Sequence, residues 1–248
     1  MFDKYFKDFS KGMGAKAKAK TTKSKTAKTS KKAAGANAKS AKITAIDIKK
    51  IKEKLQKIIP GNLVIDSVKP IDSSGYTPEG ADLIAYKEYC QDIIKIMDGY
   101  VPYELIYGTF YITQQLNNTT LTDVAKRTES VKKLNHFTGD ETIENPTVIP
   151  SFCIAYSSGL SLSEIKESMV EYYIENHIEH QHELDILVVV DKGIIVKNWR
   201  ERRSYIALET GADTNKSFFI LMSDYLDLDR GAIDFRRYLT KDTIYTEY

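Results

Sequence analysis

The chain has 248 residues, of which 42% are hydrophobic and 28% are charged, and this composition is typical of a globular protein. No run of about 18 apolar residues is present, so the sequence predicts no membrane insertion. The first residues, MFDKYFKDFSKG, lack the apolar core of a secretory signal, which favours a virion or host-cytoplasm location. Cys90 and Cys153 are too few for a disulfide framework or a cysteine zinc site, and both are expected in the core.

The net charge of +2 conceals two oppositely charged parts. Residues 11–42 contain eleven lysines and no acidic residue, so removing them from the total leaves −9 for the rest of the chain. The sequence therefore predicts a basic arm attached to an acidic body.

The first 42 residues are expected to lie outside the folded domain. Residues 1–10 place four aromatic side chains at helical spacing, which predicts a short amphipathic plug. Residues 11–42 consist mainly of Ala, Lys, Thr, Ser and Gly, so we expect a disordered arm. Such a polycation binds nucleic acid or an acidic partner, or it acts only as a solubilising tether. The lysines expected to make these contacts are Lys16, Lys18, Lys20, Lys23, Lys25, Lys28, Lys31 and Lys32.

Residues 43–228 have the alternating patterns of an α/β domain, and 229–248 form an aromatic C-terminal tail. The pattern predicts helices at 43–61, 120–137, 161–181 and 215–228, strands at 61–68, 81–89, 102–112, 147–158 and 204–211, and a hairpin at 185–198. Expected helix caps are Thr44 with Asp47, Thr120 with Asp123, and Ser161 with Glu164. This order predicts a mixed central sheet flanked by helices.

Three stretches of this domain resemble the PD-(D/E)XK nuclease fold, and more narrowly a bacterial family of restriction-nuclease-like domains. They are GADLIAYKE, PYELIYGTFYITQQLNNTTLTDVAKRTESVKKLN and DILVVVDKGIIVKN. The resemblance covers about residues 43–228 and implies that Asp82 stands at the position of the family's metal-binding aspartate. It also implies that Tyr111 and Thr113 stand where the family has Glu-x-Lys.

These replacements remove the chemistry that the family uses. Metal-dependent phosphodiester cleavage needs at least two carboxylates around a hard cation and benefits from a lysine. A tyrosine phenol stays protonated at neutral pH, and a threonine carries no charge. The sequence therefore assigns no catalytic residue, except Asp82 if the acids have been rearranged. Acids weighed for such a rearrangement are Glu104, placed on the 102–112 strand, and Asp66, Asp72 and Glu164.

Two further groups of residues have a functional and a structural interpretation. His177 and His180 are expected to share a helix face, which suits a metal ion, although a helix C-terminus favours histidine by itself. A second group consists of Trp199, Arg200, Arg202 and Arg203. It suits either a protein interface or the binding of phosphate groups, and we expect the interface.

The sequence leaves three functions open and predicts no cofactor. The first is a non-catalytic subunit of an oligomeric ring, because the basic arm and aromatic tail resemble in style the connector and tail-ring proteins of crAss-like bacteriophages. The second is a metal-dependent endonuclease rearranged around Asp82. The third is a simple nucleic-acid-binding module.

Overall fold

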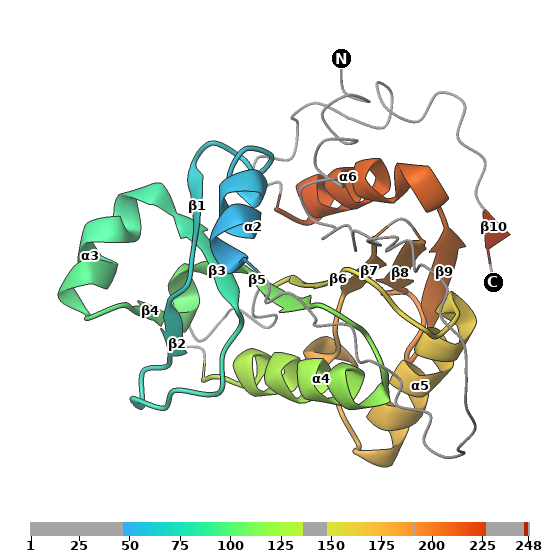
Figure 1. Ribbon diagram of the computed structural model, residues 1–248. Coiled ribbons are helices and arrows are strands. Elements are labelled where there is room, and N and C mark those ends of the chain that lie inside the picture. Colours follow the sequence, from blue (N-terminus) through green and yellow to red (C-terminus); the bar gives the residue numbers. More distant parts are fainter. Residues whose placement is uncertain (1–46, 136–147, 191, 227–245, 248) are drawn as a thin grey trace, which may run out of the picture.

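In the computed structural model, the described residues are 47–135, 148–190, 192–226 and 246–247. The Lys-rich arm, the aromatic plug and most of the C-terminal tail lie outside these residues. Within them the chain forms a central mixed sheet with helices on both faces (Figure 1). The predicted α/β class with a mixed sheet is therefore confirmed. No helix of this part of the chain is long and apolar enough to cross a membrane.

The central sheet has the strand order β1-β3-β5-β6-β7-β8-β9-β10. Neighbours β5, β6 and β7 run parallel, and every other pair is antiparallel. A second, parallel pair joins β2 and β4. The strands are β1 (Leu63–Asp66), β2 (Lys69–Ile71), β3 (Leu83–Lys87), β4 (Tyr100–Pro102), β5 (Ile106–Thr113), β6 (Ser151–Ala155), β7 (Ile186–Val189), β8 (Gly193–Lys197), β9 (Tyr205–Glu209) and β10 (Thr246–Glu247).

The helices cover the two faces of this sheet and form a three-layer arrangement. Figure 1 shows α2 and α6 on one side of the sheet and α4 and α5 on the other. Each side has its own buried apolar cluster, as expected when the faces of a parallel region are both covered. The α-helices are α2 (Ile48–Leu55), α3 (Gln91–Ile96), α4 (Asn118–Lys132), α5 (Leu162–Glu175) and α6 (Thr214–Leu226), and the 3-10 turns are η1 (Glu88–Cys90), η2 (Tyr103–Leu105), η3 (His180–His182) and η4 (Gly211–Asp213).

The helix caps follow the sequence signals in one case and differ in two. Ser161 and Glu164 form the predicted capping box of α5. In α4 the box is instead formed by Asn117 and Thr120, because the helix begins two residues earlier than predicted. In α2 the side chain of Asp47 caps the helix by itself, accepting from the backbone of Lys50.

The two cysteines are buried, as predicted, and α4 buries an apolar stripe that includes Leu121, Val124 and Ala125. Strands β7 and β8 pair antiparallel, as the predicted hairpin requires, and Gly193 lies against Leu162 of α5. A Cβ atom at Gly193 would lie 2.3 Å from the carbonyl oxygen of Leu208 and 2.4 Å from the Leu162 side chain. Glycine is therefore required there for the helix to pack on the hairpin.

Candidate functional site

Asp82 lies immediately before β3, and its carboxylate is held on both oxygens. Oδ2 accepts a hydrogen bond from the backbone N–H of Ile112 in β5 at 2.6 Å. Oδ1 accepts from Nη2 of Arg127 in α4 at 2.8 Å. The side chains of Asp82 and Arg127 are only 20% and 16% exposed, so this ion pair is shielded from water.

Arg127 makes the further contacts that fix its position. Its Nε and Nη2 atoms both donate to the carbonyl oxygen of Gly80, at 3.1 and 2.8 Å. Its guanidinium lies over the Tyr111 ring, 5.3 Å from the ring centroid, and Nη1 is 3.7 Å from a carboxylate oxygen of Asp123. Burial opposes protonation, but the hydrogen bond and charge of Asp82 outweigh it, so the pKa of Arg127 is raised.

The two residues at the Glu-x-Lys positions have local partners. Tyr111 is fully buried, and burial raises the pKa of its phenol to about 12. Its hydroxyl donates to the carbonyl oxygen of Arg127 at 3.4 Å. The Thr113 hydroxyl donates to the carbonyl oxygen of Gln115 at 3.2 Å. Neither side chain offers an anionic ligand to a cation beside Asp82.

The fold family implies a divalent metal at Asp82, and the residues found there do not fit one. Both oxygens of Asp82 are engaged, and the neighbouring carboxylate of Asp123 contacts the same guanidinium. That guanidinium supplies the positive charge that a metal would bring. Across the residues that the structure describes, no group of three or more His, Cys, Asp or Glu side chains could hold a metal ion.

The other acidic residues that the sequence suggested for a rearranged metal site lie elsewhere in the structure. Asp66 pairs with Lys52 at 2.7 Å, and Asp72 accepts the hydrogen bonds of a turn from Ser74 and Tyr76. Glu104 was predicted to lie on a strand, and this prediction is wrong. It lies in the turn η2 (Tyr103–Leu105), which precedes β5. Glu164 caps α5.

His177 and His180 do not share a helix face, contrary to the sequence prediction. Helix α5 ends at Glu175, His177 follows the C-cap in a left-handed conformation with φ of 54°, and His180 begins the separate turn η3. Nδ1 of His180 is 2.9 Å from the Glu183 carboxylate. The helix was predicted too long because residues 176–181 contain no proline or glycine to mark its end.

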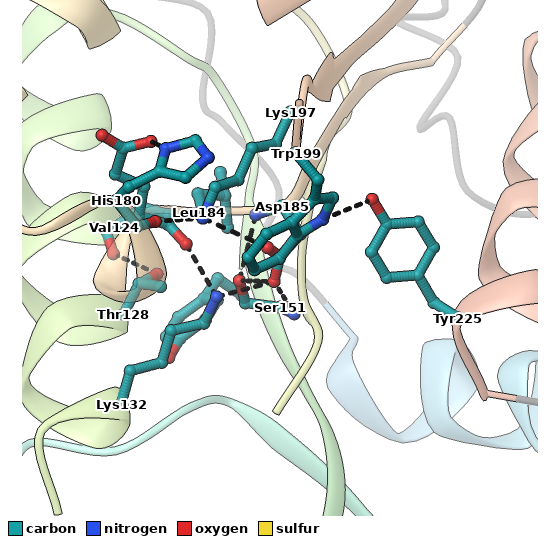
Figure 2. Close-up of polar contacts among 12 residues, drawn as sticks. Val124, Thr128, Lys132, Ser151, His180, Leu184, Asp185, Lys197, Trp199 and Tyr225 are labelled. Carbon is teal, nitrogen blue, oxygen red and sulfur yellow. Dashed lines mark hydrogen bonds and ion pairs between the residues drawn. The ribbon is translucent and has the colours of Figure 1, made fainter. Parts of the chain in front are cut away.

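A buried charged network that the sequence did not reveal lies between α4 and the sheet (Figure 2). Asp185 Oδ2 accepts from Nζ of Lys132 at 2.6 Å and from the backbone and hydroxyl of Ser151 at 2.8 Å each. Nζ of Lys197 is 3.8 Å from Oδ1 of Asp185 and donates to the carbonyl oxygen of His180. Burial lowers the pKa of Lys132, and it lowers the pKa of Lys197 to about 8.

This network is closed to a substrate because its charged side chains are at most 2% exposed. It joins the end of α4 to the strands β6, β7 and β8 and to the loop before β7. We therefore assign it to the stability of the fold, since buried charges persist only when they are paired.

The loop between β8 and β9 carries Trp199 and three arginines. Trp199 donates from Nε1 to the Tyr225 hydroxyl at 3.1 Å, and Nζ of Lys197 lies 3.9 Å from the centroid of its ring (Figure 2). The arginines Arg200, Arg202 and Arg203 are exposed. Arg202 and Arg203 line two adjoining hollows beside α5, and Arg200 lines neither.

Comparison with solved structures shows which fold this is. NucC from E. coli MS115-1 in its apo form is 17% identical, with a TM-score of 0.59 over 72% of this chain and 81% of the NucC chain. The cAAA-bound form of the same NucC gives 17%, 0.58, 74% and 77%. NucC from P. aeruginosa ATCC27853 in its cAAA-bound form gives 14%, 0.57, 77% and 83%. The chain has the nuclease-like α/β fold.

No protein-family model matches the sequence. The search of curated proteins likewise gives no match. The similarity therefore concerns the fold, and it agrees with the resemblance carried by the stretches around Asp82 and Tyr111. None of these findings supports the bacteriophage virion role considered from the sequence.

Proposed function

We propose that this protein binds nucleic acid on a nuclease-like fold, and that its Asp82 centre does not cleave through a metal ion. The observation that carries the proposal is the engagement of both Asp82 oxygens by Arg127 and by the backbone of Ile112. The guanidinium donates to protein acceptors from Nε and Nη2 and, unlike a metal ion, offers no open coordination position for a water molecule or a phosphate oxygen.

Three features support nucleic acid as the ligand. The chain shares the nuclease-like fold of NucC, and two of the similar NucC structures are cAAA-bound forms. The expected basic arm, residues 11–42, would follow a phosphate backbone without reading its sequence. Within the body, Arg202 and Arg203 add exposed cations on the loop that borders α5.

The second candidate function is a metal-dependent endonuclease with a rearranged site. It is favoured by the fold and by the position of Asp123, which contacts the same guanidinium as Asp82. If Arg127 were displaced, two carboxylates would face one space, and two carboxylates are the minimum that a divalent cation needs.

A cleavage and binding experiment separates the two. Supercoiled plasmid is incubated with the full chain and Mg²⁺ or Mn²⁺, with and without cAAA, and binding to linear DNA is measured by mobility shift. We expect a shift without cleavage. Cleavage that is abolished by Asp82→Asn, but retained by Asp92→Asn in exposed α3, would establish the endonuclease instead.

We also propose that the protein self-associates. Tyr89, Ile93 and Ile96 follow one another at helical spacing on η1 and α3, and they are 77%, 49% and 85% exposed. An apolar stripe of this kind is typical of a contact surface. Light scattering should report an oligomer for the natural chain and a smaller species for Ile93→Glu with Ile96→Glu. An unchanged mass would refute this use of α3, and a monomeric natural chain would refute self-association.

A further inference from the structure

Two adjoining hollows border the loop from β8 to β9, the larger one against α5 and the smaller one against residues 177–181 that follow α5. One has a volume of about 780 Å³ and the other about 560 Å³, and Arg202 and Arg203 line both. Each volume lies in the range of sites that hold small organic ligands. The two arginines therefore stand at the boundary between the two hollows.

The backbone at the smaller hollow is strained at two of its lining residues. His177 and Arg203 have φ of 54° and 56°, and among the described residues only Asp98 is another non-glycine with positive φ. The left-handed region favours glycine, because a Cβ atom costs energy there. The chain thus has a histidine and an arginine at two positions where glycine would be less strained. Backbone strain of this kind is concentrated at ligand-binding positions in proteins.

The smaller hollow suits an anion, because its lining holds two guanidinium groups and one carboxylate, that of Glu179, which already accepts from Gln181. Arg202 and Arg203 are exposed, and within the described ranges neither has a carboxylate within ion-pair distance. Paired guanidinium N–H groups match the spacing of phosphate oxygens. The carbonyl groups at the end of α5, which would repel an anion, already accept hydrogen bonds from the backbone of Asn176, His177 and Ile178.

The larger hollow has a different character. Glu167, Glu171 and Glu175 are spaced four residues apart along α5, and Val170 and Ile174 lie between them. Carboxylates accept hydrogen bonds from the hydroxyl groups of a ribose, and aliphatic side chains offer a surface to a base. The ligand that satisfies both hollows is anionic at one end and carries hydroxyl groups and a flat apolar part at the other.

We propose that these hollows bind a nucleotide by its 5′-phosphate, with the phosphate at Arg202, Arg203 and His177 and the ribose beside the glutamates of α5. The nucleotide is either a free mononucleotide or the 5′ end of a strand. The proposal rests on the proposed binding of nucleic acid and adds the place and the chemical group that the body recognises, and it does not depend on the Asp82 centre.

The test measures anisotropy of a short single-stranded RNA, labelled at its 3′ end, that carries either a 5′-phosphate or a 5′-hydroxyl. The full chain is expected to bind the phosphorylated strand at least tenfold more tightly. Arg202→Ala and Arg203→Gly should each remove this preference, and Arg200→Ala, on the same loop but outside both hollows, should keep it. Arg203→Gly should not lower the melting temperature, because glycine relieves the left-handed strain.

Competition with AMP distinguishes the two sources of the phosphate. Displacement of the phosphorylated strand by AMP at similar concentration indicates a mononucleotide site, and weak displacement indicates a strand end. Equal affinity for both strands with no binding of AMP, or equal effects of the Arg200 and Arg203 variants, would overturn the inference. In that outcome retained DNA binding leaves the proposed function intact, whereas no DNA binding at all refutes the proposed function.

Discussion

Arg127 shows how a nuclease-like centre can keep its architecture without a cation from solution. A divalent ion at the Asp82 position would be held by several anionic oxygens and would keep open positions for water. The guanidinium instead donates to Asp82 and to the backbone of Gly80 and rests on the Tyr111 ring. The same carboxylate that would bind a metal in the family therefore joins β3, β5 and α4 in this chain.

The first prediction concerns the strength of this ion pair. Arg127→Ala should lower the free energy of unfolding by about 2 kcal/mol, because it leaves a shielded carboxylate without its charged partner. In a cycle with Asp82→Asn, the two effects should be coupled by about 1 kcal/mol. Urea unfolding measures both, and Lys95→Ala, in an exposed pair, should change the free energy by less than about 0.5 kcal/mol. Full recovery of Arg127→Ala by MgCl₂ would show that a metal can take the place of the guanidinium.

The second prediction concerns Lys197, because burial lowers its pKa in the folded protein to about 8, from an ordinary value of 10.5. Above pH 8 the folded protein loses this proton first, so the unfolded state binds more protons and stability from this group rises with pH. The free energy of unfolding of the natural chain, minus that of Lys197→Met, should therefore increase by about 1 to 2 kcal/mol between pH 8 and pH 9.5. A difference that stays flat or falls over this range would contradict the assignment.

The sequence was sufficient to identify Asp82 as a candidate site residue, but not to identify its partner Arg127. Asp82 stands in a stretch that resembles a known motif, whereas Arg127 lies on a helix whose visible signal is its apolar stripe. Lys132 and Asp185 were missed for a related reason: each looks like a surface charge at the end of an element. Only the packing of α4 over the start of β7 brings them to 2.6 Å, and this contact between distant segments leaves no local pattern.

At the scale of elements, helix starts are better predicted than helix ends. The start of α5 is marked by a hydroxyl side chain and a glutamate three residues later, and both make the expected hydrogen bonds. Its end has no such signal, because His177 takes the left-handed position that glycine usually occupies. Short elements such as β2, α3 and β4 were missed, since three to six residues carry too little periodicity.

The third prediction tests the start of α5. Ser161→Ala should lower the free energy of unfolding by about 1 kcal/mol, because the backbone N–H of Glu164 loses its acceptor and the reciprocal bond from the cap is weakened. Ser163→Ala is the matched control, because its hydroxyl bonds only the exposed side chain of Glu167. It should cost a few tenths of a kcal/mol. Equal effects of the two substitutions in chemical unfolding would contradict the role of the cap.

At the scale of the molecule, alternating strands and helices were enough to predict the α/β class. They also predicted a mixed sheet, because a short hairpin forces antiparallel pairing and the long connections through α4 and α5 allow parallel pairing. The order of the strands was not predictable in the same way. It depends on which strand edges meet, and the only guide to this from the sequence was the resemblance to the nuclease fold.

The last prediction separates the two charged parts of the chain. The four charges of residues 1–10 cancel, so a chain of residues 43–248 has a formal charge of −9 and should bind DNA weakly, whereas the full chain gains eleven lysines. Each lysine that contacts a phosphate adds about 0.9 to the slope of log affinity against log salt, so the slope should fall by several units on removal of residues 1–42. Melting temperature should stay the same, because the described core begins at Ile51.

If the arm supplies general affinity and Arg202 and Arg203 recognise the 5′-phosphate, the shortened chain should keep its preference for the phosphorylated strand. Fluorescence anisotropy across a salt series measures both quantities, and an unchanged slope would show that the arm does not contact DNA.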